Sequence, residues 1–294
     1  INGGPEEEGH PECLISNGEV AIWLEKAWQR APFAVKLSPR EVTLDLYPSE
    51  VSPLVVKHGT SFRHVMRIAV GKDVEIKASK EVRWHIEPSY ACSTMVLGPL
   101  IARTPETMRL FPGYEKAINA AIYKARRTKV PPEPGGAWGA PAQLTDEPSQ
   151  APEYFGLPHY GDWPMGVGGY GASYCMYADN EYDVPLIYFQ QYMRTGAWEL
   201  LEVAKHSAIH MADVDCMITN GDMNFHGYRD HAEDHSVHRR PGGELGHYWT
   251  DGLWCQYFIN GDVWAREAAE ALGRFLIRLF AGETDDAIRR RFLN

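Results

Sequence analysis

The sequence predicts a mainly helical protein with a smaller antiparallel β portion before its helices. Three observations support this fold class. Between residues 18 and 70 apolar and polar residues alternate with a period of two, which is typical of half-buried strands. After about Tyr170 apolar residues recur at helical spacing. Between these regions, residues 128–169 are rich in Pro and Gly, which predicts loop structure.

The β portion is predicted from three alternating segments: GEVAIWLEKAW (18–28), REVTLDLYP (40–48) and TSFRHVMRIAVG (60–71). Such alternation is typical of antiparallel sheets with one face in the core and one in solvent. Three strands are few for an independent sheet, so we expect an upstream part of the fold to be missing from this chain. We assign residues 1–103 to a β-sandwich portion and its connector.

Residues 104–294 are expected to form the helical part, beginning with a helix near Tyr114 to Arg127. Two helical hairpins follow, and Pro185 marks a helix start or a kink in the first of them. The second hairpin is predicted by an aromatic helix, a Gly-Asp turn and a long amphipathic helix over 246–282. Hairpins of this kind bury their apolar faces against more helices, and a ring of them is an α/α toroid. The predicted fold class is therefore a partial α/α toroid preceded by antiparallel β-sandwich strands.

Composition excludes several function classes. The formal net charge of −10 argues against nucleic-acid binding, because neutralising phosphates requires clustered Lys and Arg. No apolar run approaches the length of a membrane-spanning helix, so no membrane association is expected. Motifs for a P-loop, a dinucleotide-binding turn, a GxSxG elbow and an HExxH helix are absent from the sequence. Five cysteines without a CxxC pair predict buried, unpaired thiols.

Histidines gather in one part of the chain, where seven of the twelve lie between residues 206 and 247. The stretch DMNFHGYRDHAEDHSVHRR (222–240) combines several of them with tyrosine and arginine. Histidine and tyrosine can exchange a proton near neutral pH, and arginine can clamp a carboxylate by two parallel hydrogen bonds. This mixture favours β-elimination on a uronic acid, although a charged surface loop would have the same composition. In that reaction a cation neutralises the C6 carboxylate, a base removes the C5 proton and an acid protonates the leaving oxygen.

A histidine pair on a predicted helix could bind a metal ion. His206 and His210 are four residues apart and Asp213 lies three further on, so on one helix the three side chains share a face. Two imidazoles and a carboxylate suit zinc or a similar divalent ion. A substrate cleft or a solvated helix end would show the same spacing, and these alternatives stay open.

Together, these motifs resemble the C-terminal toroid of the exo-rhamnogalacturonan lyase-like polysaccharide lyases. The resemblance rests on the histidine-rich stretch and on YGDW (160–163), NEYD (180–183), AKHSAIHMADVD (204–215) and GHYWTDGLWCQYFINGD (246–262). That family combines a rift barrel, a central β-sandwich and an α/α toroid. The resemblance implies that residues 60–71 end the sandwich and that the toroid begins near residue 104. The chain departs from the family by lacking the first domain and by ending after about four toroid helices, so we expect a fragment.

Our leading hypothesis is a polysaccharide lyase that acts by β-elimination on an acidic, uronate-containing glycan such as rhamnogalacturonan or ulvan. The base would be His231 or His235, and the acid would be Tyr228 or Tyr160. The groups that would neutralise the uronate or bind the sugar are Arg239, Arg240, Asn180, Glu181, Trp163, His247 and Trp249. A divalent cation, calcium or zinc, would be the cofactor. The resemblance also implies a secreted or periplasmic enzyme.

Two other functions remain open at this point. A glycoside hydrolase on the same toroid would use two carboxylates, for which Glu181, Asp213, Asp215, Glu233 and Asp234 are candidates. A non-catalytic module would hold sugars on its aromatic and histidine-rich face without cleaving them. A product with a new double bond would select the lyase, whereas binding without any product would select the module.

Overall fold

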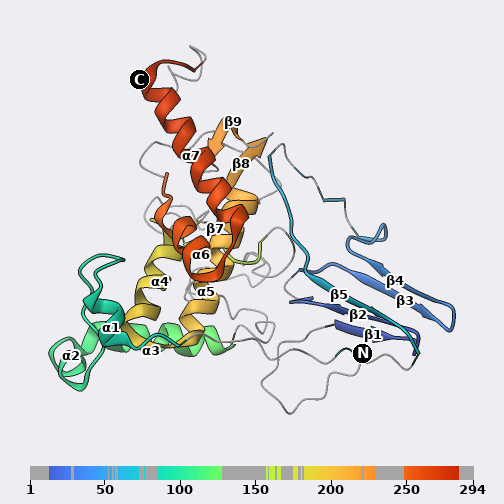
Figure 1. Ribbon diagram of the computed structural model, residues 1–294, viewed down its shortest axis with the longest axis horizontal. Coiled ribbons are helices and arrows are strands. Elements are labelled where there is room, and N and C mark those ends of the chain that lie inside the picture. The colour runs from blue at the N-terminus through green and yellow to red at the C-terminus, as the bar shows by residue number, and fades with distance from the viewer. Residues whose placement is uncertain are drawn as a thin grey trace.

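In the computed structural model the sheets of the N-terminal part lie to one side of the helices, whereas two shorter antiparallel hairpins lie beside the helices (Figure 1). The structure describes residues 13–27, 30–51, 53–54, 56, 59–72, 76, 85–127, 157, 159–162, 164–166, 175–177, 180, 182–219, 222–228 and 248–284. Of these, residues 13, 123–127, 164–166, 175–177 and 222–228 are described by their backbone alone. This mixed arrangement confirms that helices and antiparallel strands occur together in the chain.

The larger sheet contains β1 (Cys13–Ser16), β2 (Val20–Leu24) and β5 (Met66–Val70), with β2 between its two partners. Ile22 in β2 lies opposite Ile15 in β1 and Ile68 in β5. A separate hairpin pairs β3 (Ala34–Ser38) with β4 (Glu41–Asp45). Each of the three segments predicted as strands contains one strand, namely β2, β4 or β5. The structure adds β1 and β3, which the alternation does not predict.

The helices begin and end at the signals that the sequence carries. Their bounds are α1 (Pro88–Ser93), α2 (Pro105–Leu110), α3 (Pro112–Arg127), α4 (Val184–Thr195), α5 (Trp198–His210), α6 (Asp251–Asn260) and α7 (Val263–Ala281). Pro185 lies in the first turn of α4, where a missing N–H costs nothing, so it starts the helix and does not kink it. Gly196 and Gly261 end α4 and α6 in the left-handed conformation, which favours glycine. Both predicted hairpins are thereby confirmed as α4–α5 and α6–α7.

The described short strands form two further hairpins near the helices. β6 (Pro164–Gly166) pairs with β7 (Cys175–Tyr177), and β8 (Cys216–Thr219) pairs with β9 (Asp222–Tyr228). β8 follows α5 directly through the π-helical turn η3 (Met211–Asp215). The start of the histidine-rich stretch is therefore a strand.

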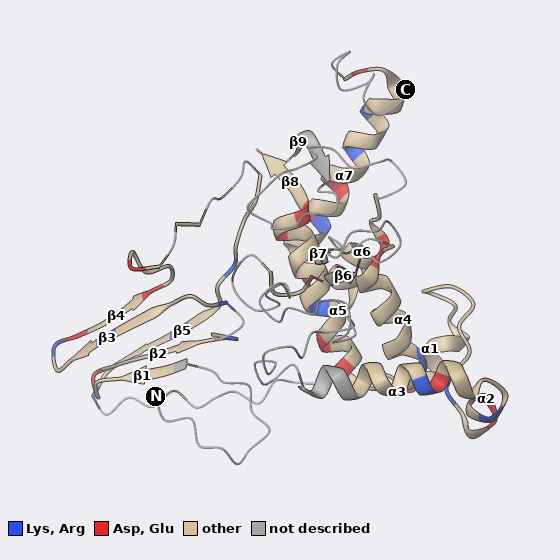
Figure 2. Cartoon of the chain, turned by 180° about the vertical axis from the view of Figure 1, so that it is seen from behind, with Lys and Arg blue, Asp and Glu red and all other residues tan. Residues whose placement is uncertain are grey.

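Two apolar clusters stabilise the helical part. One lies under α7, whose side chains Ala265, Ala268 and Leu272 pack with Leu253 of α6 and with Met211. The other joins the two helices of the first hairpin. Among the described residues, no helix is long and apolar enough to cross a membrane. Lys and Arg are interspersed with Asp and Glu over the described elements (Figure 2).

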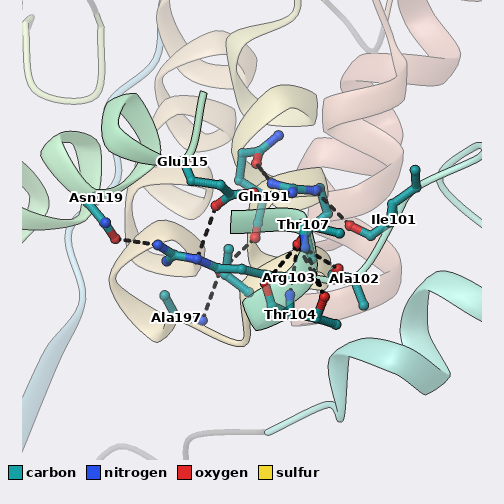
Figure 3. Close-up of polar contacts among 11 residues, drawn as sticks. Ile101, Ala102, Arg103, Thr104, Thr107, Glu115, Asn119, Gln191 and Ala197 are labelled. Atoms are coloured by element: carbon teal, nitrogen blue, oxygen red, sulfur yellow. Dashed lines mark hydrogen bonds and ion pairs between the residues drawn. The ribbon is translucent and has the colours of Figure 1, made fainter. Parts of the chain in front are cut away.

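A buried ionic clamp holds α3 against α4 (Figure 3). Glu115 of α3 is 2% exposed, and its two carboxylate oxygens lie 3.0 Å from Nε of Arg103 and 2.6 Å from Nη2 of Arg194. Arg194 also donates to the side chain of Gln191 and to the carbonyl of Ile101. Removing one partner of such a pair leaves an uncompensated charge in the interior. The three side chains therefore depend on one another.

The clamp predicts a large stability loss in Glu115→Gln, because both arginines lose their counter-charge. We expect the free energy of unfolding, measured by urea denaturation, to fall by about 3 kcal/mol. The matched control is Glu106→Gln, since Glu106 is an exposed residue in the first turn of α2. Equal midpoints for the two variants would contradict the clamp.

Candidate functional site

Three buried side chains with metal-ligating atoms meet where α5 ends. His210 is the last residue of α5, Asp215 ends η3, and Asp162 belongs to the loop of residues 159–162. One ligand atom from each residue lies within 4.8 Å of the others. Nε2 of His210 is 3.2 Å from Asp215 and 3.9 Å from Asp162, and all three side chains are at most 1% exposed. This group, which we call the Asp162 group, could hold a metal ion.

The π-helical turn decides which aspartate accompanies His210. In a regular helix a residue three or four positions on shares the face of His210, whereas a π turn bonds residues five apart. Asp215 lies five residues after His210 and reaches it, as the distance above shows. Asp213 instead pairs with Nε of Arg63 at 2.9 Å. The local unwinding of the helix therefore separates the two aspartates.

Hydrogen bonds fix the orientation of the Asp162 group. Nδ1 of His210 lies 3.2 Å from the carbonyl oxygen of Tyr160, which can only accept, so Nδ1 carries the hydrogen and Nε2 faces the aspartates. Asn180 is fully buried and bridges the two carboxylates. Its backbone N–H donates to Asp162 at 3.0 Å, and its side-chain amide donates to Asp215 at 3.2 Å. Asn180 adopts φ 53°, a strained conformation that often marks functional sites.

Close packing against α5 sets the path of the loop that carries Asp162. Gly161 has φ +105°, and a Cβ added there would lie 2.3 Å from the carbonyl oxygen of His206 and 2.9 Å from Cβ of His210. Only glycine fits both the backbone angle and the space. The loop thereby places Tyr160 over one turn of α5 and Asp162 beside the next.

A second polar cluster surrounds Tyr160, one helical turn before the Asp162 group. The rings of Tyr160 and His206 have centroids 4.8 Å apart. Nε2 of His206 lies 2.7 Å from Nζ of Lys26, and Lys26 is also paired with Glu202 at 2.9 Å. Burial and the Lys26 charge lower the pKa of His206 to about 3, so the imidazole is neutral near pH 7. The ammonium can only donate, so Nε2 accepts and Nδ1 carries the hydrogen.

Arg30 brings a positive charge to the same cluster. Its guanidinium carbon lies 6.0 Å from the centroid of the Tyr160 ring. Burial lowers the pKa of Arg30. The pKa of His64 is lowered by the burial of His64 itself and by the charge of Arg30. Nδ1 of His64 and Nδ1 of His206 are buried atoms without a hydrogen-bond partner among the residues described. A phenol beside a cation and a neutral imidazole could bind a carboxylate and transfer a proton next to it.

The structure brings together only part of the predicted site. Of the predicted metal ligands, His210 alone belongs to the Asp162 group. His206 contacts Lys26, whose charge repels a metal ion, and Asp213 contacts Arg63. Asn180, predicted to contact substrate, is fully buried and contacts protein groups.

Trp249, predicted to bind the sugar, packs on protein groups, and its sugar-binding role stays a prediction. It is partly buried and packs on the core under α7, and its ring lies 5.8 Å from that of Tyr182. Tyr182 is 68% exposed. The pair is therefore an aromatic surface supported by the core.

Several predicted residues lie outside the described part of the chain, and their roles stay predictions: Trp163, Glu181, His231, His235, Arg239, Arg240 and His247. Tyr228 ends β9, but its side chain is outside the description as well. Sequence reasoning gave no site role to Asp162, Lys26 or Arg30. The YGDW motif, which contains Asp162, is a sequence signal that could have indicated its role. Lys26 and Arg30 follow a strand pattern that gives no indication of a functional site.

Comparison of the chain with family models, with curated proteins and with solved structures gave no match.

The packing of Gly161 predicts that Gly161→Ala destabilises the protein. A left-handed φ and a clash with α5 should together lower the free energy of unfolding by about 2 kcal/mol or more. The control is Gly273→Ala within α7, where an added Cβ meets nothing within 4 Å. That variant should gain up to about 1 kcal/mol from helix propensity. Urea denaturation of both tests the claim, and a stable Gly161→Ala variant would contradict it.

The buried carboxyl of Asp183 predicts a pH dependence of stability. Burial raises the pKa of Asp183 to about 6, although N–H groups of Gly252 and Leu186 lower it. The folded state then binds more protons than the unfolded state, so this contribution is present at low pH and is lost as pH rises from about 4 to about 6. Over that window the stability of the protein relative to Asp183→Asn should decrease by about 3 kcal/mol. A difference that is constant with pH in urea denaturation would contradict this.

Proposed function

We propose that the protein is a polysaccharide lyase that cleaves an acidic, uronate-containing glycan by β-elimination. The observation that carries the proposal is the cluster around Tyr160, where a phenol, the Arg30 guanidinium and the neutral imidazole of His206 lie together. These are the group types that β-elimination of a uronate requires. The histidine-rich stretch supports the same chemistry by its composition.

In the proposed reaction Arg30 binds the C6 carboxylate of the uronate and offsets its negative charge, which makes the C5 proton more acidic. His231 or His235 takes that proton. The electron pair of the C5–H bond forms the C4–C5 double bond, the C4–O bond breaks, and the phenol of Tyr160 donates its proton to the leaving oxygen. The imidazole of His206 packs against the phenol and holds it in place. Arg239 and Arg240 remain candidates for the same carboxylate.

Within this proposal, residues 104–294 are part of an α/α toroid and residues 1–103 are part of a β-sandwich. The paired helical hairpins and the small antiparallel sheets support it. The Tyr182–Trp249 pair would stack on a sugar ring. The substrate would resemble rhamnogalacturonan or ulvan, and the enzyme would be secreted or periplasmic.

A divalent cation, calcium or zinc, belongs to the proposal as a cofactor. The Asp162 group is the place for it, and its side chains are at most 1% exposed. An ion buried this deeply would position the protein groups around it and would not contact the substrate. Arg30 is therefore the proposed partner of the uronate.

The test is ultraviolet absorbance of the conjugated double bond during incubation with uronate polysaccharides. Tyr160→Phe should lower the rate by about 100-fold or more, because it removes the general acid. The matched control is Tyr90→Phe, since Tyr90 is 67% exposed on α1, and its rate should equal that of the wild type. Equal rates for Tyr160→Phe and the wild type would remove Tyr160 from the mechanism.

Arg30→Gln gives a second prediction. Losing the charge that binds the carboxylate should lower kcat/KM by roughly 10- to 100-fold. The control is Arg67→Gln, since Arg67 also lies over an aromatic ring, that of Trp23 at 4.7 Å, but belongs to the exposed β5. A loss of the same size in both variants would show that Arg30 has no special role.

A hydrolase is the second candidate, because Asp162 and Asp215 offer two carboxylates within 4.8 Å of each other. Retaining glycosidases have carboxyl groups about 5 Å apart. The side chains of both residues are fully buried, which favours the lyase. New reducing ends without a double bond would select the hydrolase, and sugar binding without any product would select a binding module.

A further inference from the structure

We infer that the Asp162 group, together with Asn180, binds a divalent transition-metal ion of the zinc class in a closed structural site. This deepens the proposal of a cation in the same group, because it names the class of ion and gives it a structural role, and it stands whichever reaction the protein performs.

Buried negative charge points to a bound cation. Two carboxylates and an imidazole meet with side-chain exposures of 0% and 1%. Negative charges at this depth are stable only when positive charge compensates them, since desolvation is costly. A protonated His210 would supply one positive charge, and a divalent ion supplies two. A divalent ion therefore suits the charge of the two carboxylates, with Nε2 of His210 as the third ligand.

The distances among the three side chains are suited to a single ion. Nδ1 of His210 donates to the Tyr160 carbonyl, the outer hydrogen bond that metal-ligating histidines usually make, and this leaves Nε2 as the ligand atom. Four ligands at zinc distances lie about 3.3 Å from one another in a tetrahedron. The separations of 3.2 Å and 3.9 Å from Nε2 to the two carboxylates are close to this value. Small shifts would bring the three atoms onto one ion.

Asn180 supplies an independent observation. Its side chain is 0% exposed, and its amide nitrogen donates to Asp215 and to the carbonyl of Ser207. Its Oδ1 is a buried acceptor without a hydrogen-bond partner among the described residues. Oδ1 belongs to the side chain whose amide nitrogen contacts Asp215, so a turn of the amide would bring this oxygen to the group as the fourth ligand.

Ligand type favours a transition metal over calcium. Calcium takes six to eight oxygen ligands, whereas imidazole suits zinc and its neighbours in the first row. A site with four protein ligands and no exposed position has the coordination number of structural zinc, with oxygen ligands here in place of the usual cysteines. The ion would tie the loop of residues 159–162 to α5, η3 and the Asn180 turn, and through His210 it would fix the backbone of Tyr160.

The experiment measures metal binding by the full chain after dialysis against a chelator, with zinc, manganese and calcium as separate probes. We expect one zinc ion per chain, tighter binding of zinc than of calcium, and a melting temperature that rises with zinc concentration. Asp215→Asn and His210→Gln should lose this binding, whereas the control His85→Gln, at an exposed histidine, should keep it. Tight binding that persists in both site variants would place the ion elsewhere, for example at the histidine-rich stretch, and would overturn the inference.

Cobalt substitution in the wild-type chain keeps the test independent of whether the variants fold. Cobalt bound by the Asp162 group should give visible bands without thiolate charge transfer, because no cysteine belongs to the group. Thiolate bands, or the absence of any stoichiometric cobalt and zinc binding, would overturn the inference. Zinc binding without double-bond formation would refute only the lyase proposal, and the reverse result would refute only the metal site.

Discussion

The site depends on the contact between the loop of residues 159–162 and helix α5. Gly161 lies so close to the backbone of His206 that no side chain fits, and the residues on either side of it are thereby fixed. Tyr160 is placed against the ring of His206, and Asp162 is placed beside His210. One backbone contact therefore creates two neighbouring polar clusters with different chemistry. The cluster around Tyr160 is partly exposed and carries cations, whereas the Asp162 group is closed and carries carboxylates.

Compensation of buried charge explains how the rest of the chain supports these clusters. Arg63 pairs with Asp213 of η3 and with Asp262, which caps α7. It thereby ties the segment before β5 to both helical hairpins. Lys26 makes the corresponding connection from the end of β2 to Glu202 of α5. The sheet and the helices thus meet through ion pairs that border the proposed site, so the β portion contributes directly to it.

The sequence predicts the longer helices and the strands β2, β4 and β5, because their signals are local, whereas it does not predict the other strands, and β7 lies where helical spacing predicts a helix. Periodicity indicates α5 and α7, and Gly196 and Gly261 mark the ends of the helices before them. The candidate site is predicted only in part, because its geometry depends on contacts between distant segments. The spacing of His206, His210 and Asp213 assumes a regular helix, and the π turn replaces Asp213 by Asp215. Arg30 lies far from Tyr160 in sequence and carries no pattern that links the two.

The most direct test of the lyase account is to digest a uronate polysaccharide in water enriched in heavy oxygen and to weigh the released oligosaccharides by mass spectrometry. β-Elimination adds no water across the broken bond. The account therefore predicts products with an unsaturated uronate at the non-reducing end and no heavy oxygen. Saturated products that carry heavy oxygen would show hydrolysis and would contradict the assignment of Tyr160 and Arg30 to an elimination.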